Sequence, residues 1–246
     1  MKSVIKTTNQ FLNKFGYKLT QVKDNDSDIY RREFLKNSRS VNQAHNQQTV
    51  EKVKYLKEKY QEPVFGKVYV WDLMKDLAHC IDPTDPSLYC VSQLVHTMQV
   101  VGAMEEDGVE DEDMIISALI HDLGKLLLLT DEAPENIVCM NTVVTSYEEG
   151  IGLDNCIFQW NHDEFVYDRF KDYVPKNIAW IIRYHSIMIK PNLVLMNEQD
   201  KIYTEKYLKS FRKYDMDSKS IYNLPKNKLS DYRELIEKSF PEPIIF

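Results

Sequence analysis

The chain has 246 residues, a formal net charge of -7 at pH 7 and 43% hydrophobic residues. This length is enough for one large domain with a substantial core, which we favour over two small domains. The acidic balance argues against binding to nucleic acid or to anionic membranes, because both attract basic surfaces. We therefore expect neither of them as a partner.

Residues 1–40 are polar and rich in Lys, Asn, Asp and Ser, which predicts an irregular N-terminal arm before a helical domain that spans residues 41–246. In that domain, apolar residues at helical spacing predict amphipathic helices over residues 43–60 and 70–80. Residues 81–87 contain two prolines and predict a loop. Asp85 and Pro86 in this loop fit the N-cap and the first position of a following helix.

Helical periodicity continues over most of the remaining sequence. Residues 91–104 and 113–123 predict two central buried helices, and Gly124 fits a helix terminator. Residues 130–152 are mostly connection, and further helices are predicted over residues 153–170, 176–188 and 201–213. No strand pattern or internal repeat is convincing. The sequence therefore predicts an all-α, single-domain fold.

Cysteine usage and hydropathy indicate the compartment. The four cysteines show no CxxC spacing, and no secretory leader precedes them. The longest apolar stretch, residues 114–129, is interrupted by His121, Asp122 and Lys125, which is typical of a buried core helix rather than a membrane span. We expect a monomer in a reduced, cytoplasmic setting, without a transmembrane segment.

A His-Asp pair inside an apolar run, His121-Asp122, is the strongest chemical signal. Adjacent imidazole and carboxylate groups can bind one metal ion while the carboxylate bridges to a second ion. Helical spacing directs His162 and His185 to the interior. A single histidine on an apolar face is usually an ordinary core residue, but a buried group of this size needs a cation or mutual pairing to offset its desolvation. The candidate metal ligands are His96, His121, Asp122, His162, His185 and Asp215.

Four other polar residues near these motifs are expected to have simpler roles. His45 and His79 lack an apolar setting, so we expect them at the surface or at helix caps. Asp163 and Glu164 follow His162 directly, and we expect them to be exposed or to lie outside the ligand set.

The motifs resemble a known family. A His-Asp pair between apolar residues, with an earlier and a later histidine, is the signature of the HD-domain superfamily of helical bundles. A finer resemblance, to myo-inositol oxygenase, runs from about residue 43 to the C-terminus. The segments that carry it are Gln-Thr-Val at 48–50, a loop at 81–86, His-Asp-Leu-Gly-Lys at 121–125, Trp-Asn-His-Asp-Glu at 160–164, Arg-Tyr-His-Ser at 183–186 and Phe-Arg-Lys-Tyr-Asp at 211–215.

The resemblance implies two iron ions in a mixed-valent Fe(II)/Fe(III) pair, with O2 as co-substrate. Asp122 would bridge both ions. One ion would also be bound by His96, His121 and Asp215, and the other by His162 and His185, which would leave the second ion open to substrate. In the family the Fe(III) side chelates substrate hydroxyls and the Fe(II) side reacts with O2, so a four-electron oxidation needs no external reductant.

The resemblance also implies residues for catalysis and substrate binding. Asp122 and Lys125 would be catalytic, because an ammonium group beside a substrate hydroxyl favours the deprotonated hydroxyl. The implied substrate contacts are Asp82, Thr84, Lys125, Asn141, Ser186 and Lys219.

This chain departs from the family at two places that concern the substrate. Asn141 stands where the family has an acidic substrate contact, and the loop beyond it is shortened. The family's lid arginine has its nearest counterpart in residues 30–34, Tyr-Arg-Arg-Glu-Phe. Such changes alter specificity more readily than chemistry.

Three functions are compatible with these residues. We favour a di-iron oxygenase that cleaves or hydroxylates a small polyol-like molecule, with inositol as the leading substrate. The alternative is a metal-dependent phosphohydrolase of the HD type, in which the metal ions activate water. It has less support, because Lys125, Lys219 and Arg183 are the main groups that could bind phosphate. A metal-free binding protein is the third, and the filled ligand positions argue against it.

Overall fold

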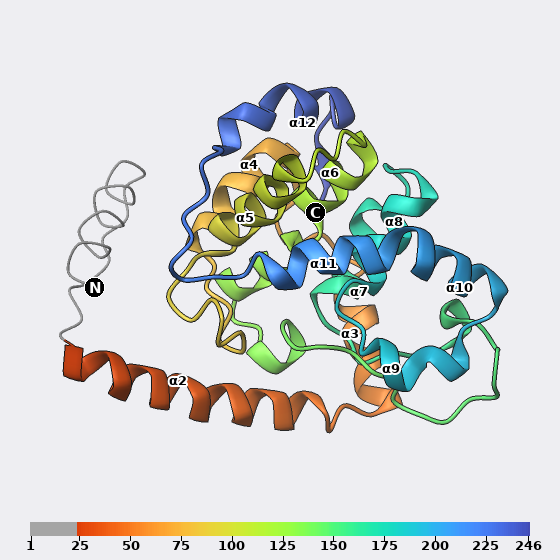
Figure 1. Cartoon of the computed structure of the whole chain (residues 1–246). Coiled ribbons are helices and arrows are strands. Elements are labelled where there is room, and N and C mark those ends of the chain that lie inside the picture. The colour runs from red at the N-terminus through yellow and green to blue at the C-terminus, as the bar shows by residue number, and fades with distance from the viewer. Residues whose placement is uncertain (1–23) are drawn as a thin grey trace.

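The computed structural model describes residues 24–246, and these residues are mainly helical (Figure 1). The all-α fold predicted from the sequence is confirmed. No helix within the described part of the chain is both long enough and apolar enough to cross a membrane.

The longest helix is α2, Asp24–His45, which lies along one edge of the molecule (Figure 1). Its position corrects the expectation of an irregular arm for residues 24–40, and residues 1–23 lie outside the described part. Two contacts attach α2 to the loop before α5: the ring of Phe34 packs against Tyr89 with a centroid distance of 5.9 Å, and Ser38 Oγ donates to the carbonyl of Thr84.

The next helices are shorter than their sequence patterns suggest. Helix α3, Val50–Lys59, begins seven residues later than expected, because the Thr49 side chain caps it by accepting from the Lys52 amide. Helix α4, Val70–Asp76, continues as a 3-10 turn, Leu77–His79. The helix expected directly after Asp85 is absent, since that carboxylate accepts from the Ser87 amide within a turn.

Two central helices follow that loop. Helix α5, Gln93–Glu106, is capped by Ser92, and α6, Glu112–Ile120, is capped by Asp111. After α6 the chain tightens into a 3-10 helix, η2, Leu123–Leu129, so Gly124 lies at a change of helix type. Helices α5 and α6 pack on each other. The buried side of α6 is apolar apart from Ser117, whereas that of α5 carries apolar residues together with Gln93, His96, Thr97 and Gln99.

Helices α7 and α8 are also shorter than predicted: α7 begins later than expected, and α8 ends earlier. The sequence predicts a helix from residue 153, but α7 is His162–Phe170, with Asn161 as its N-cap. The residues before it form a 3-10 turn, Leu153–Asn155, and extended chain. Helix α8, Lys176–Tyr184, ends just before His185. Helices α7 and α8 contact each other, and α8 also contacts α6.

The C-terminal part is a series of short helices. Helices α9, Ile189–Asn192, and α10, Glu198–Tyr203, precede a π-helical turn, Thr204–Leu208, which leads into α11, Lys209–Asp217. The predicted helix over residues 201–213 would end before Asp215. In the structure Asp215 lies within α11. Further 3-10 turns are Pro134–Asn136, Leu193–Leu195 and Leu229–Tyr232.

The chain closes with α12, Arg233–Ser239, and a two-residue strand, β2, Ile244–Ile245, which pairs antiparallel with β1, Lys67–Val68. The sequence pattern predicts no strand, and this small sheet corrects that expectation. One large apolar cluster contains residues of every helix from α3 through α8 and of the C-terminal segment. Trp160, Phe165 and Phe246 are almost completely buried in it.

Candidate metal centre

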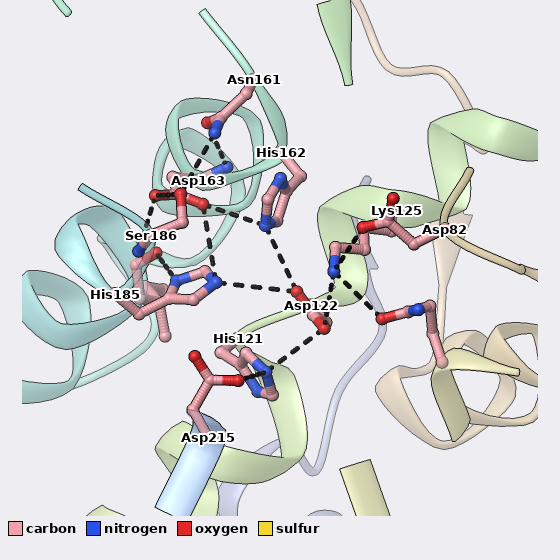
Figure 2. A network of polar contacts seen from close by, with 12 residues as sticks. Asp82, His121, Asp122, Lys125, Asn161, His162, Asp163, His185, Ser186 and Asp215 are labelled. Atoms are coloured by element: carbon pink, nitrogen blue, oxygen red, sulfur yellow. Dashed lines mark hydrogen bonds and ion pairs between the residues drawn. The ribbon is translucent and has the colours of Figure 1, made fainter. Parts of the chain in front are cut away.

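The six predicted metal ligands converge in the core from five helices, and Figure 2 shows five of these ligands, His121, Asp122, His162, His185 and Asp215. His96 comes from α5, His162 from α7 and Asp215 from α11, while His121 and His185 directly follow α6 and α8. All six residues are buried, and none is more than 4% exposed. Helix ends and helix faces far apart in the sequence thus place four imidazoles and two carboxylates together.

Asp122 lies between two sets of histidines and uses a different oxygen for each. Its Oδ2 is 3.3 Å from His121 Nε2 and 3.6 Å from His96 Nε2. Its Oδ1 is 3.3 Å from His162 Nε2 and 3.6 Å from His185 Nε2. Asp215 joins only the first set, with Oδ1 3.1 Å from His96 Nε2. The geometry therefore forms two donor groups that share one carboxylate.

Main-chain carbonyls determine which ring nitrogen carries the proton in three of the imidazoles. The Nδ1 atoms of His121, His162 and His185 lie 2.8–2.9 Å from the carbonyl oxygens of Ala118, Ile137 and Ile182. A carbonyl only accepts, so each Nδ1 carries the proton, and in the neutral ring Nε2 is left as a lone pair. These Nε2 atoms face the carboxylates, which is the arrangement that metal ligation requires.

The donor spacings fit bound ions. Zinc-like ions lie about 2.0–2.2 Å from imidazole nitrogen and carboxylate oxygen, which places neighbouring ligands of one ion roughly 2.9–3.6 Å apart. The distances around Asp122 fall in this range. Three atoms among them, His121 Nε2, Asp122 Oδ1 and His162 Nε2, are buried without a hydrogen-bond partner among the described residues. A cation between the donors would satisfy them.

Nearby charges keep the carboxylates of Asp122 and Asp215 ionised. Burial alone would raise the pKa of Asp122, but the charges of His121 and Lys125 hold it well below its usual value. The pKa of Asp215 is likewise well below its usual value, because Lys219 and His96 outweigh the effect of burial. Both side chains are thus anionic and available as ligands.

The two predicted substrate lysines lie beside the carboxylates, and Figure 2 shows Lys125 next to Asp122 and Asp82. Lys125 Nζ is 3.1 Å from each of three oxygens, in Asp122, Asp82 and Gln93. Burial lowers its pKa, but the charges of Asp122 and Asp82 raise it above the usual value, so Lys125 is charged. Asp82 Oδ1 also accepts from the amide and hydroxyl of Thr84, at 2.7 Å each. The loop at 81–86 is therefore attached to the centre.

Lys219 lies much closer to the centre than an isolated surface lysine would. Its side chain is 14% exposed, and Nζ is 3.0 Å from Asp85 Oδ2 and 3.6 Å from Asp215 Oδ1. Burial lowers its pKa, but these two carboxylates raise it above the usual value.

The remaining predicted substrate contacts interact with other side chains. Ser186 Oγ donates to Asp163 Oδ2 at 2.5 Å. Asn141 is buried, and its side chain lies 3.1 Å from His45 Nε2. His45 is 1% exposed and bonds through Nδ1 to the carbonyl of Glu135, so the expectation of a surface or capping role is wrong for it. Glu135 and Asn141 lie 90 and 96 residues away in the sequence, so local pattern gave no signal for these contacts. His79 is exposed, as expected.

Asp163 and Glu164 are both buried, so of the two expected alternatives the exposed one is wrong. Glu164 forms ion pairs with Arg183 and Lys57. Asp163 lies beside the histidines, with Oδ1 3.1 Å from His162 Nε2. Burial raises its pKa to about 6, although His185 and Ser186 lower it. The Asp at 163 is adjacent to a predicted ligand, and that adjacency was the only sequence signal for it.

Gly124 allows the two halves of the centre to meet. A Cβ atom at this position would lie 2.3 Å from the carbonyl oxygen of His162 and 2.8 Å from its Cα. Only a glycine therefore permits η2 and the start of α7 to approach this closely.

The fold and the centre together define a helical protein with a buried histidine–carboxylate cluster. The chain matches the family model described as myo-inositol oxygenase over residues 35–142 and 135–246. It therefore belongs to the myo-inositol oxygenase family.

Curated relatives agree with this assignment. The chain is 30% identical to a probable inositol oxygenase of Oryza sativa subsp. japonica over 97% of its own length and 87% of that protein. It is 30% identical to inositol oxygenase 1 of Arabidopsis thaliana, over 90% and 83% of the two chains. It is 26% identical to the inositol oxygenase of Dictyostelium discoideum, over 84% of its own length and 85% of that protein.

Proposed function

We propose that this protein is an O2-dependent, non-haem di-iron oxygenase that oxidises a small polyol of the inositol type. The observation that carries the proposal is the shared carboxylate of Asp122, whose two oxygens face separate histidine sets. Histidine nitrogen together with carboxylate oxygen suits iron. Membership of the inositol oxygenase family supports the reaction class.

The donor sets assign a role to each ligand. One ion would be held by His96, His121 and Asp215, and the other by His162 and His185, with Asp122 common to both. When bound, a mixed-valent iron pair would supply Lewis acidity toward substrate hydroxyls and the electrons for reaction with O2.

The charged residues around the centre would bind and orient the polyol. Lys125 and Lys219 would favour the deprotonated form of a hydroxyl placed beside them. Both lysines contact the loop at 81–86 through Asp82 and Asp85, so substrate in this loop would meet two positive charges. The neutral Asn141 would not provide the carboxylate acceptor of the family. We therefore propose that myo-inositol is a poorer substrate than a related polyol with a different hydroxyl pattern.

The test is to load metal-free protein anaerobically with Fe(II), oxidise it partially and record EPR spectra. O2 uptake and product mass are then followed with inositol isomers and other polyols. We expect a mixed-valent signal from a coupled iron pair, and O2 uptake that saturates with one polyol. Phosphate release from an ester without O2 uptake would instead support the phosphohydrolase. Efficient conversion of myo-inositol to a ring-opened acid would contradict the altered specificity and leave the oxygenase proposal intact.

A further inference from the structure

Asp163 has one carboxylate oxygen that is hydrogen-bonded and one that is not. Its Oδ2 accepts from the hydroxyl of Ser186 at 2.5 Å and from the amide of the same residue at 3.3 Å. Its Oδ1 is buried without a hydrogen-bond partner among the described residues. This oxygen points to the two histidines of the second donor group, 3.1 Å from His162 Nε2 and 3.6 Å from His185 Nε2 (Figure 2).

The histidines do not offer hydrogen bonds to this oxygen in their neutral form. The Nδ1 protons of His162 and His185 are donated to the carbonyls of Ile137 and Ile182. Each Nε2 is therefore a lone pair, and a lone pair beside a carboxylate oxygen is unfavourable in a buried site. A cation between Asp163 and the two imidazoles removes this conflict.

Asp163 Oδ1 lies at nearly the same distances from the two histidines as Asp122 Oδ1. Asp122 Oδ1 lies 3.3 Å and 3.6 Å from the two Nε2 atoms, and Asp163 Oδ1 lies 3.1 Å and 3.6 Å from them. These four distances match the roughly 2.9–3.6 Å between neighbouring ligands whose bonds to one ion are about 2.0–2.2 Å long. Each Nε2 atom of the second donor group thus lies at ligand spacing from two carboxylate oxygens, one of Asp122 and one of Asp163.

We propose that Asp163 is a fourth protein ligand of the second ion when no substrate is bound. The inference rests on the two-ion centre of the proposed function. It adds one protein ligand to the second ion of that centre in the substrate-free state. The second ion is closed by His162, His185, Asp122 and Asp163 until substrate arrives. Because Ser186 holds the other oxygen, the carboxylate stays in place when a substrate oxygen replaces Oδ1.

The experiment compares the wild-type chain with Asp163→Asn. Metal-free protein is titrated anaerobically with Co²⁺, and bound metal and visible absorption are measured together. The control is Glu164→Gln, which removes the next carboxylate of the same helix turn. Glu164 is equally buried but pairs with Arg183 and Lys57 and not with the histidines. Circular dichroism checks that each variant is folded.

We expect wild type and Glu164→Gln to bind two Co²⁺ ions with the same spectrum. Asp163→Asn should bind the first ion normally and the second more than about 100-fold more weakly, beyond the roughly 10–100-fold that loss of an outer partner costs. Its second ion should also have shifted absorption bands. Unchanged affinity would overturn the inference. So would weaker binding with an unchanged spectrum, because Asp163 would then only position the histidines.

A measurement on wild type alone covers the case in which Asp163→Asn does not fold. A crystal structure of the Co²⁺-loaded, substrate-free chain should place Asp163 Oδ1 at a ligand distance of about 2.0–2.2 Å from the second ion. A clearly longer distance overturns the inference. Neither measurement requires turnover. A chain with this ligand that oxidises no polyol contradicts the proposed function alone, and a polyol oxygenase without this ligand contradicts the inference alone.

Discussion

At the scale of single residues, Asp122 joins the two donor groups, so its removal should affect both. In Asp122→Ala we expect both ions and all activity to be lost together, measured by metal analysis and O2 uptake. Lys219→Ala is the matched comparison, because Lys219 contacts Asp215 at 3.6 Å but is not itself a ligand. It should retain two ions and show weaker turnover. Full metal occupancy in Asp122→Ala would contradict the bridging role.

Gly124 is a second residue whose role is steric. In Gly124→Ala the new Cβ must displace the backbone of His162, which lies within 2.3–2.8 Å of it. Overpacking of this kind costs about 1–3 kcal/mol of stability. Urea unfolding of the metal-free protein measures this cost, and metal titration should show a weakened second site.

The control for this prediction is Gly102→Ala. Its Cβ would meet only the side chain of Asn227, at 3.3 Å, so the change should be small. Equal stability of the two variants would show that the close approach at Gly124 has no energetic consequence.

At the scale of elements, Glu132 connects the end of α3 to the chain before the 3-10 turn Pro134–Asn136. Its carboxylate accepts from Lys59, Tyr60 and Asn136. Burial raises its pKa, but these hydrogen bonds dominate and lower it from 4.5 to about 2. A lowered folded-state pKa stabilises the protein at pH values above the unfolded pKa, and the effect is lost as pH falls from 4.5 toward 2.

We therefore expect wild type to be more stable than Glu132→Gln at pH 6, with a difference that shrinks as the pH falls below about 4.5. Chemical unfolding at several pH values measures it. The comparison with the variant is essential, because other buried carboxylates also titrate in this range. A difference that stays constant from pH 6 to pH 3 would contradict the role of Glu132.

Sequence patterns predicted the long apolar helices better than their ends. The central helices α5 and α6 lie where apolar periodicity placed them. The start of α7 was predicted nine residues too early, because Phe158 and Trp160 continue an apolar pattern in extended chain. Helix α2 was missed because its composition is polar, and its docking depends on partners distant in sequence, such as Tyr89.

The candidate site was predictable where motifs are local. His121 and Asp122 are adjacent, and His162 and His185 follow from helical spacing, so these residues could be found by inspection. The burial of His45 and Asp163 depends on contacts with Asn141 and Ser186, 96 and 23 residues away. No local pattern specifies such contacts.

At the scale of the whole molecule, the ligands join five helices that are otherwise held by apolar packing. Ions that bind only the folded state stabilise it by about 2.7 kcal/mol when their concentration is 100 times the dissociation constant. In a chain of this size each kcal/mol shifts Tm by roughly 2–4 °C. We therefore expect chelation to lower Tm by about 5–10 °C for each ion removed.

Differential scanning calorimetry with and without chelator measures this shift. In Asp122→Ala, which should not bind the ions, the same chelator should leave Tm unchanged. An equal shift in both proteins would mean that the chelator acts elsewhere on the chain.

The hydrogen bonds of the imidazoles also bear on how the centre can change during evolution. The acceptors for His121, His162 and His185 are main-chain carbonyls of Ala118, Ile137 and Ile182. Every amino acid supplies a carbonyl, so substitutions at these three positions keep the acceptor as long as the chain keeps its path. The tautomers are therefore inherited with the backbone rather than with particular side chains. A lineage can replace much of the surrounding core and still present the same three nitrogens to a metal.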